Sequence, residues 1–162
     1  MKPLLTLHWG AHRMLDLNMS QTILIVEDND DDFEATERAL FRKKNLSNPI
    51  VRCRDGQDAL DYLNRDGQYA SRDEHGPPSL ILLDLNMPGL DGRQVLKRIK
   101  QDDALCKIPV VVMTTSTAQE DIDASYRAGA NTYVHKPIYW NDFVEAILRL
   151  HDYWFQIAVL PK

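Results

Sequence analysis

The sequence predicts an α/β fold, a doubly wound parallel sheet of five strands with helices on both faces. Two features of the chain predict this fold. Short continuous apolar runs recur along the sequence, and such runs are typical of strands buried on both faces. Segments with helical spacing of apolar residues separate these runs, and this alternation indicates parallel strands joined by right-handed crossovers. The length of 162 residues and the hydrophobic fraction of 44% suit one domain with a sizeable core.

The strands are expected wherever a short apolar run is bounded by turn residues. Residues 22–26 and 108–113 are continuous and rich in β-branched residues, which indicates central strands. Residues 49–53 alternate between apolar and polar positions, which favours a place nearer an edge. All five expected strands are 22–26, 49–53, 79–83, 108–113 and 132–135.

A helical segment is expected after each strand, because apolar residues there recur at helical spacing. The first begins at Asp30 and runs to about Lys44, where basic residues suit a helix C-terminus. In the fourth, Ile122 and Tyr126 are expected to face inward. Residues 66–78, with two glycines and two prolines, predict a loop. The other helices are expected at 57–64, from Asp91-Gly92 onward, at 119–128 and at 142–150.

Composition excludes several classes of protein. The net charge of −5 without a long basic run argues against a nucleic-acid surface. No apolar run approaches the roughly 20 residues of a membrane-spanning helix. Two cysteines, Cys53 and Cys106, are too few for a zinc site or a disulfide framework. They fit free thiols in the cytoplasm, although a single disulfide between them stays open.

The two ends of the chain are expected to lie outside the main domain. Residues 1–19 predict a disordered or non-native extension, because no secretory signal pattern is present. Met19 is the expected natural start, because it stands just before the first strand. The domain is expected to span 20–150. Residues 151–162 form an aromatic tail.

Polar residues of particular types follow four of the strands. Glu27 and Asp28 follow the first, Asp84 the third, Thr114 the fourth and Lys136 the last. Because parallel strands end at one edge of the sheet, neighbouring ends can share a pocket. Three carboxylates need a cation there, and Mg²⁺, which takes carboxylate, water and phosphate oxygens, fits them. A carboxylate can act as a nucleophile, and Lys and Thr side chains can bind a phosphoryl group. The set predicts phosphoryl transfer onto Asp84.

Four spaced motifs resemble the receiver domain of two-component response regulators. They are Val26-Glu27-Asp28-Asn29, Leu83-Asp84-Leu85-Asn86-Met87-Pro88-Gly89-Leu90-Asp91-Gly92, Val112-Met113-Thr114-Thr115-Ser116 and Tyr133-Val134-His135-Lys136-Pro137. The resemblance covers roughly residues 20–150 and implies a flavodoxin-like fold with strand order 2-1-3-4-5.

The resemblance also implies a role for each matching residue. Asp84 would accept the phosphoryl group. Asp28, Asp84 and the backbone carbonyl of Asn86 would bind Mg²⁺ directly, and Glu27 would act through a water. The switch residues follow from the same resemblance: Lys136 would contact the phosphoryl group, Thr114 would swing toward it, and Tyr133 would turn inward.

Within that family the chain is similar to the single-domain regulators that partner cyanobacterial and other bacterial phytochromes. The acidic run after Asp28, the Thr114-Thr115-Ser116 triplet and the tail carry this resemblance. It implies that a histidine kinase is the phosphoryl donor and that the protein is not an enzyme in the ordinary sense. Output is expected through protein binding, because few residues follow the last helix.

The tail adds more aromatic and apolar surface than one terminal helix can bury. Surplus of this kind marks an interface, so a homodimer is expected through the last helix and the tail. The residues assigned to it are Phe143, Tyr153, Trp154 and Phe155. The alternative is that the tail folds back on its own domain.

Several of these residues also fit a purely structural role, and three rival functions stay open. Asp30 to Asp32 suit a helix N-terminus and are assigned that structural role, and Tyr133 could be a core aromatic. A haloacid-dehalogenase-type phosphatase would need a second Asp where Asn86 stands. A flavodoxin-like redox module would need a phosphate-binding loop after the first strand, where this chain has acid. A third alternative is a docking module whose Asp84 is never phosphorylated.

Overall fold

The sheet is parallel and has five strands in the order β2-β1-β3-β4-β5, which confirms the expected fold class. The computed structural model describes residues 21–42, 47–71 and 76–161, so the expected N-terminal extension and the expected last residues of the first helix, near Lys44, lie outside the described residues. The strands are β1 Ile23–Val26, β2 Ile50–Cys53, β3 Leu80–Leu83, β4 Val110–Thr114 and β5 Thr132–His135.

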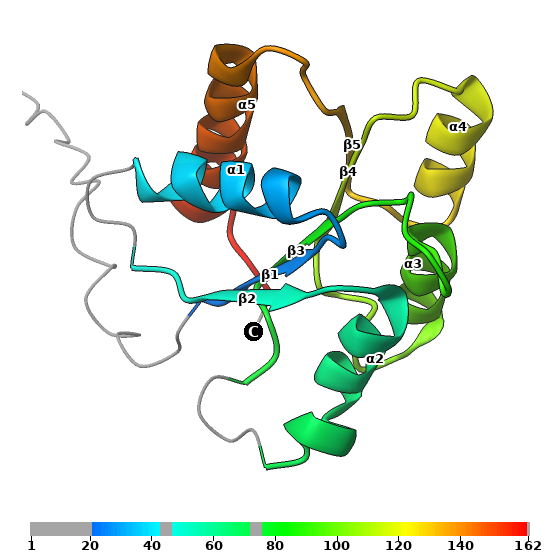
Figure 1. The fold of residues 1–162 in the computed structure, drawn as a ribbon. Coiled ribbons are helices and arrows are strands. Elements are labelled where there is room, and N and C mark those ends of the chain that lie inside the picture. The colour runs from blue at the N-terminus through cyan, green and yellow to red at the C-terminus, as the bar shows by residue number, and fades with distance from the viewer. Residues whose placement is uncertain (1–20, 43–46, 72–75, 162) are drawn as a thin grey trace, which may run out of the picture.

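The helices cover the two faces of the sheet. Figure 1 shows α1 and α5 on one face and α2, α3 and α4 on the other. A short 3₁₀ turn, η1, lies in the expected loop, and a single π-helical turn, η2, follows α5. The bounds are α1 Asp30–Phe41, α2 Gly56–Asn64, η1 Gly67–Tyr69, α3 Gly92–Gln101, α4 Gln119–Arg127, α5 Trp140–Asp152 and η2 Tyr153–Ile157.

Each face of the sheet has its own apolar core. Side chains alternate along a strand, so Leu24 and Val26 of β1 join the core under α2 and α3, whereas Ile23 and Ile25 join the core under α1 and α5. β1, β3 and β4 are buried along their whole length, while β2 is half-buried at the edge. The continuous apolar runs therefore mark the central strands, as expected.

One residue of α4 is oriented differently from the expectation. Tyr126 is 50% exposed, and the buried residue of α4 is the neighbouring Ser125. The hydroxyl of Tyr126 accepts a hydrogen bond from the backbone N–H of Tyr133 at the edge strand β5. An aromatic side chain with a polar tip can lie along such an edge without entering the core.

The C-terminal segment packs partly against its own domain. Phe143 and Phe155, two of the residues expected in a dimer interface, are each only 7% exposed and belong to the core under α1 and α5. Their burial in the chain itself corrects the expectation that they face a partner. Trp154 is half-buried and Tyr153 is 50% exposed.

Among the residues that the structure describes, no helix is long and apolar enough to cross a membrane.

Candidate functional site

The ends of β1 and β3 bring two acids together at one edge of the sheet. The register pairs Val26 with Leu83, and the backbone N–H of Asp84 donates to the carbonyl of Val26 at 3.1 Å. Glu27 and Asp84 therefore lie side by side, and both are buried. This is the convergence that the strand pattern predicted for these two residues.

The turn after β3 depends on a close approach of backbone to backbone. A Cβ on Gly92, the first residue of α3, would lie 2.0 Å from the carbonyl oxygen of Asp84 and 2.7 Å from Cα of Leu85. Only glycine allows this distance. Asp91 and Gln94 then cap α3 reciprocally, each side chain accepting from the other's backbone N–H. The start of α3 thus fixes the backbone on which Asp84 sits.

Lys136 joins the acids into one ion cluster. Its Nζ donates to Oε2 of Glu27 at 2.5 Å, to Oδ2 of Asp32 at 2.7 Å and to Oδ2 of Asp84 at 2.9 Å. An ammonium has three N–H donors, so all of them are used. Burial lowers the pKa of Lys136, but the hydrogen bonds with Asp32 and Glu27 outweigh burial and leave the pKa above its ordinary value.

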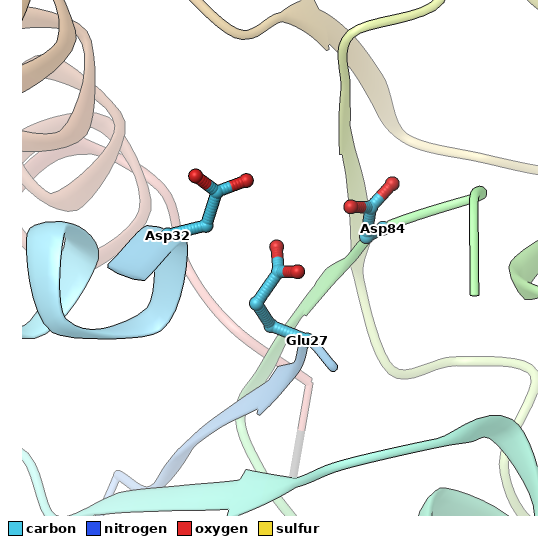
Figure 2. Close-up of side chains that lie close together, drawn as sticks. All are labelled: Glu27, Asp32 and Asp84. Carbon is cyan, nitrogen blue, oxygen red and sulfur yellow. The ribbon is translucent and has the colours of Figure 1, made fainter. Parts of the chain in front are cut away.

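The three carboxylates of this cluster can carry more negative charge than the single ammonium of Lys136 balances. One oxygen from each of Glu27, Asp32 and Asp84 lies within 4.8 Å of the others, and Figure 2 shows the carboxylates reaching this region from the end of β1, from α1 and from the end of β3. Burial raises the pKa of Glu27 from 4.5 to about 7, although Lys136 opposes the shift. Glu27 and Asp84 are the two members of this set with an expected metal role, and their carboxylate oxygens fit a hard divalent cation.

Asp32 is the residue of this cluster to which the sequence pattern gave only a helix-start role. It has that role in part, because its backbone N–H donates to Oδ1 of the N-cap residue Asn29 at 2.9 Å. Its carboxylate nevertheless binds Lys136 across the end of the sheet. The sequence feature that could have indicated this contact is the position of Asp32 in the first turn of the helix that follows Glu27 and Asp28.

Asp28 is half-buried and is not a member of the cluster of three acids. The loop that carries it is held by Arg52 of β2, which sequence reasoning did not single out. Arg52 donates from Nε to the carbonyl of Glu27 at 3.1 Å and from Nη2 to the carbonyl of Asp28 at 3.2 Å. Its Nη1 binds Asp30 at 2.6 Å, and its guanidinium lies 4.5 Å from the ring centre of Phe33.

Asn86 connects Asp84 to Thr114. The backbone N–H of Asn86 donates to Oδ1 of Asp84 at 3.0 Å, and its Nδ2 donates to Oγ1 of Thr114 at 3.2 Å. Thr114 is fully buried at the end of β4. Its hydroxyl oxygen also accepts from the backbone N–H of Ser116 at 3.4 Å.

A second network continues from Ser116 to the surface of α4. The half-buried Tyr133 donates its hydroxyl to the carbonyl of Ser116 at 3.0 Å, and Ser116 Oγ donates to Asp121 at 2.6 Å. Arg93 of α3 binds Asp121 with Nε at 2.8 Å and Nη2 at 2.7 Å. Arg93 and Ser116 together hold the pKa of Asp121 at about 2. These contacts tie the loop after β4 to both α3 and β5.

Comparisons with known proteins identify the family. The family model for the response regulator receiver domain matches residues 23–148. The response regulator Rcp1 of Synechocystis is 37% identical over 145 residues, covering 89% of this chain and 95% of Rcp1.

Two similar solved structures are the phosphorylated cyanobacterial phytochrome response regulator RcpA, with a TM-score of 0.82 and 38% identity, and the Mn²⁺-bound form of Rcp1, with a TM-score of 0.81 and 35% identity. Each match covers 88% of this chain and 99% of the other. These findings decide against the phosphatase and flavin alternatives: the chain belongs to the response regulator receiver family.

Proposed function

We propose that this receiver accepts a phosphoryl group onto Asp84 from the phosphohistidine of a histidine kinase, with Mg²⁺ as the required ion. The observation that carries the proposal is the buried Asp84 carboxylate, which has Lys136 Nζ at 2.9 Å and the Asn86 N–H at 3.0 Å. A buried carboxylate between two donors, at the carboxyl end of a central strand, is held in place for attack.

The transfer is a displacement at phosphorus. An oxygen of Asp84 forms the new O–P bond while the P–N bond of the donor breaks and leaves its electron pair on the imidazole. Mg²⁺, when bound, neutralises charge on the phosphoryl oxygens. Glu27, Asp28, Asp84 and the carbonyl of Asn86 are the groups we assign to hold it, and the oxygen-only donors suit Mg²⁺.

Lys136 and Thr114 then bind the phosphoryl oxygens. The Lys136 N–H that now reaches Asp84 can pass to the new group, and the Thr114 hydroxyl can donate to it. Water later hydrolyses the acyl phosphate. The receiver thus takes part in chemistry on its own side chain and turns over no separate substrate, so we do not class it as an enzyme.

Signalling follows from the contacts of Thr114. If the Thr114 side chain turns so that its hydroxyl donates to a phosphoryl oxygen, the bonds that its oxygen accepts from Asn86 and Ser116 are weakened, and the loop that carries Ser116 is freer to move. Tyr133 donates to that loop, so its position changes with it. A two-state surface of α4 and β5 is the output we propose.

The kinase we propose is of the phytochrome type. RcpA is a cyanobacterial phytochrome response regulator, and its structure matches this chain over nearly its whole length. We place the reaction in the cytoplasm, in keeping with the free thiols of Cys53 and Cys106.

We also propose a homodimer in which the exposed apolar side chains of the C-terminal segment meet a second copy. Tyr153 is 50%, Ile157 72% and Val159 98% exposed. Half-buried Trp154 borders them. The variant Tyr153→Ser/Ile157→Ser is expected to halve the mass seen by light scattering at micromolar concentration, while Tyr126→Ser, equally exposed on α4, leaves it unchanged. Equal masses for wild type and the double variant would contradict this interface.

The central experiment is phosphorylation by acetyl phosphate, read by intact mass. Wild type with Mg²⁺ is expected to gain one alkali-labile phosphoryl group. Wild type with a chelator, and Asp84→Asn with Mg²⁺, are expected to gain none. An unmodified wild type would leave a receiver that works by docking alone.

A further inference from the structure

We propose that Asp32 is a positioning residue for Lys136, and that it sets the rate at which Asp84 takes up a phosphoryl group. The inference rests on the proposed function of Asp84. It assigns a role to an acid that the helix start alone does not explain, because the carboxylate of Asp32 lies against Lys136 Nζ at 2.7 Å.

Lys136 is held from two sides. Glu27, with a side chain 6% exposed, binds the ammonium from the interior, while Asp32, with a side chain 42% exposed, binds it from the open side of the site. The third N–H points to Asp84 at 2.9 Å. Two acceptors therefore fix the direction of the remaining donor.

This geometry is the one that phosphoryl transfer needs. When an oxygen of Asp84 becomes part of an acyl phosphate, the carboxylate loses its charge and its hold on Lys136. The freed N–H can turn to a phosphoryl oxygen while Glu27 and Asp32 keep the other two. A lysine side chain is a point charge on a flexible four-carbon stem, so it needs such anchors to act at a fixed place.

Without Asp32 the ammonium keeps only the interior anchor. The ion pair with Glu27 then draws Nζ toward the interior, and the donor to the reacting oxygens is no longer fixed. Misplacement of a reacting group by about 1 Å can cost up to roughly a hundredfold in rate. We therefore expect a slower reaction, not a loss of fold.

The test compares three variants in acetyl phosphate reactions at saturating Mg²⁺. Asp32→Ala is expected to slow phosphorylation about tenfold or more. Asp32→Asn keeps an oxygen acceptor and is expected to stay within about threefold of wild type. The matched control is Asp31→Ala, because Asp31 is an exposed acid of the same first turn. It removes the same charge from the helix N-terminus and is expected to leave the rate unchanged.

A second measurement needs neither metal nor phosphoryl donor. Each protein is treated with a limiting amount of an acylating reagent without Mg²⁺, and modification of Lys136 is measured by peptide mass spectrometry against the other lysines. Asp32→Ala is expected to raise the labelling of Lys136 severalfold, and Asp31→Ala is not. Circular dichroism confirms that each variant is folded.

The possible outcomes distinguish a failure of this inference about Asp32 from a failure of the proposed function of Asp84. If Asp32→Ala is phosphorylated as fast as wild type, or if both Asp32 variants are faster, Asp32 does not position Lys136. If wild type itself takes up no phosphoryl group, the proposed function fails. The labelling of Lys136 then decides alone, and unchanged labelling in Asp32→Ala overturns the inference.

Discussion

Arg52 is expected to stabilise the loop that carries Glu27 and Asp28, and its replacement by Met tests this. The side chain is 13% exposed and donates to two backbone carbonyls, those of Glu27 and Asp28. Loss of each bond costs about 1 kcal/mol, and loss of the stacking on Phe33 about 1 kcal/mol more. The contact with exposed Asp30 adds little. Met keeps most of the apolar stem, so we expect Arg52→Met to lower the free energy of unfolding by about 3 kcal/mol.

The assay is urea unfolding without Mg²⁺, followed by the same titration with Mg²⁺. Arg54→Met is the control, because Arg54 is 64% exposed and also binds Asp30, at 2.7 Å. It is expected to unfold at nearly the same urea concentration as wild type. Since the held loop carries two of the assigned metal ligands, Arg52→Met should also reduce the stabilisation that Mg²⁺ provides. Equal unfolding midpoints for the two variants would refute this role of Arg52 in the loop.

Three further predictions follow from single contacts. Gly92→Ala should lower the free energy of unfolding in urea by about 2–3 kcal/mol and slow phosphorylation, because the Cβ of the alanine would lie 2.0 Å from the carbonyl oxygen of Asp84. An unchanged free energy of unfolding would contradict this close approach. The pKa of Asp121 falls from 3.8 to about 2, so its contribution to stability is present above pH 4 and is lost as pH falls through 2. The difference in unfolding free energy between wild type and Asp121→Asn, roughly 1–2 kcal/mol at pH 6, should therefore shrink toward pH 2, and a constant difference would count against the Arg93 pair. The pKa of Glu27 is about 7, so a proton competes with Mg²⁺ for its carboxylate below that pH. The affinity for Mg²⁺, measured by calorimetry, should therefore rise from pH 6 to pH 8 in wild type, and it should rise much less in Glu27→Gln.

The sequence was sufficient to predict the parallel sheet and the strand ends, because both depend on local pattern. A run such as Leu80–Leu83 is typical of a strand buried on both faces, and Asp84 is then expected at its carboxyl end. Because parallel strands end at one edge, Glu27 was expected near Asp84, and the register of β1 and β3 places the two side by side. Those inferences required no knowledge of side-chain contacts.

Contacts between distant elements could not be predicted in this way. The bonds from Lys136 to Asp32 and from Arg93 to Asp121 depend on how helices pack on the sheet, which helical spacing does not specify. An acid in a first helical turn has an adequate local explanation, so the place of Asp32 close behind Glu27 and Asp28 was not sufficient to assign it a second role. The aromatic tail was ambiguous for a similar reason: apolar surplus predicts burial, but the sequence did not say that Phe155 would be buried in its own chain.

The two networks of the site meet at Thr114, and this has a consequence for signalling. Its hydroxyl oxygen accepts from Asn86, which also donates to Asp84, and from the N–H of Ser116, whose side chain donates to Asp121. A hydroxyl that turns to donate to a phosphoryl oxygen changes its orientation toward both donors at once. The bond from Ser116, at 3.4 Å, is the longer of the two and therefore the easier to lose. The loop after β4 is thus held weakly at the proposed phosphorylation site and more firmly at its other end, where Ser116 binds Asp121 of α4 and Arg93 of α3 binds the same carboxylate through two bonds. Movement should therefore begin at the Thr114 end of the loop.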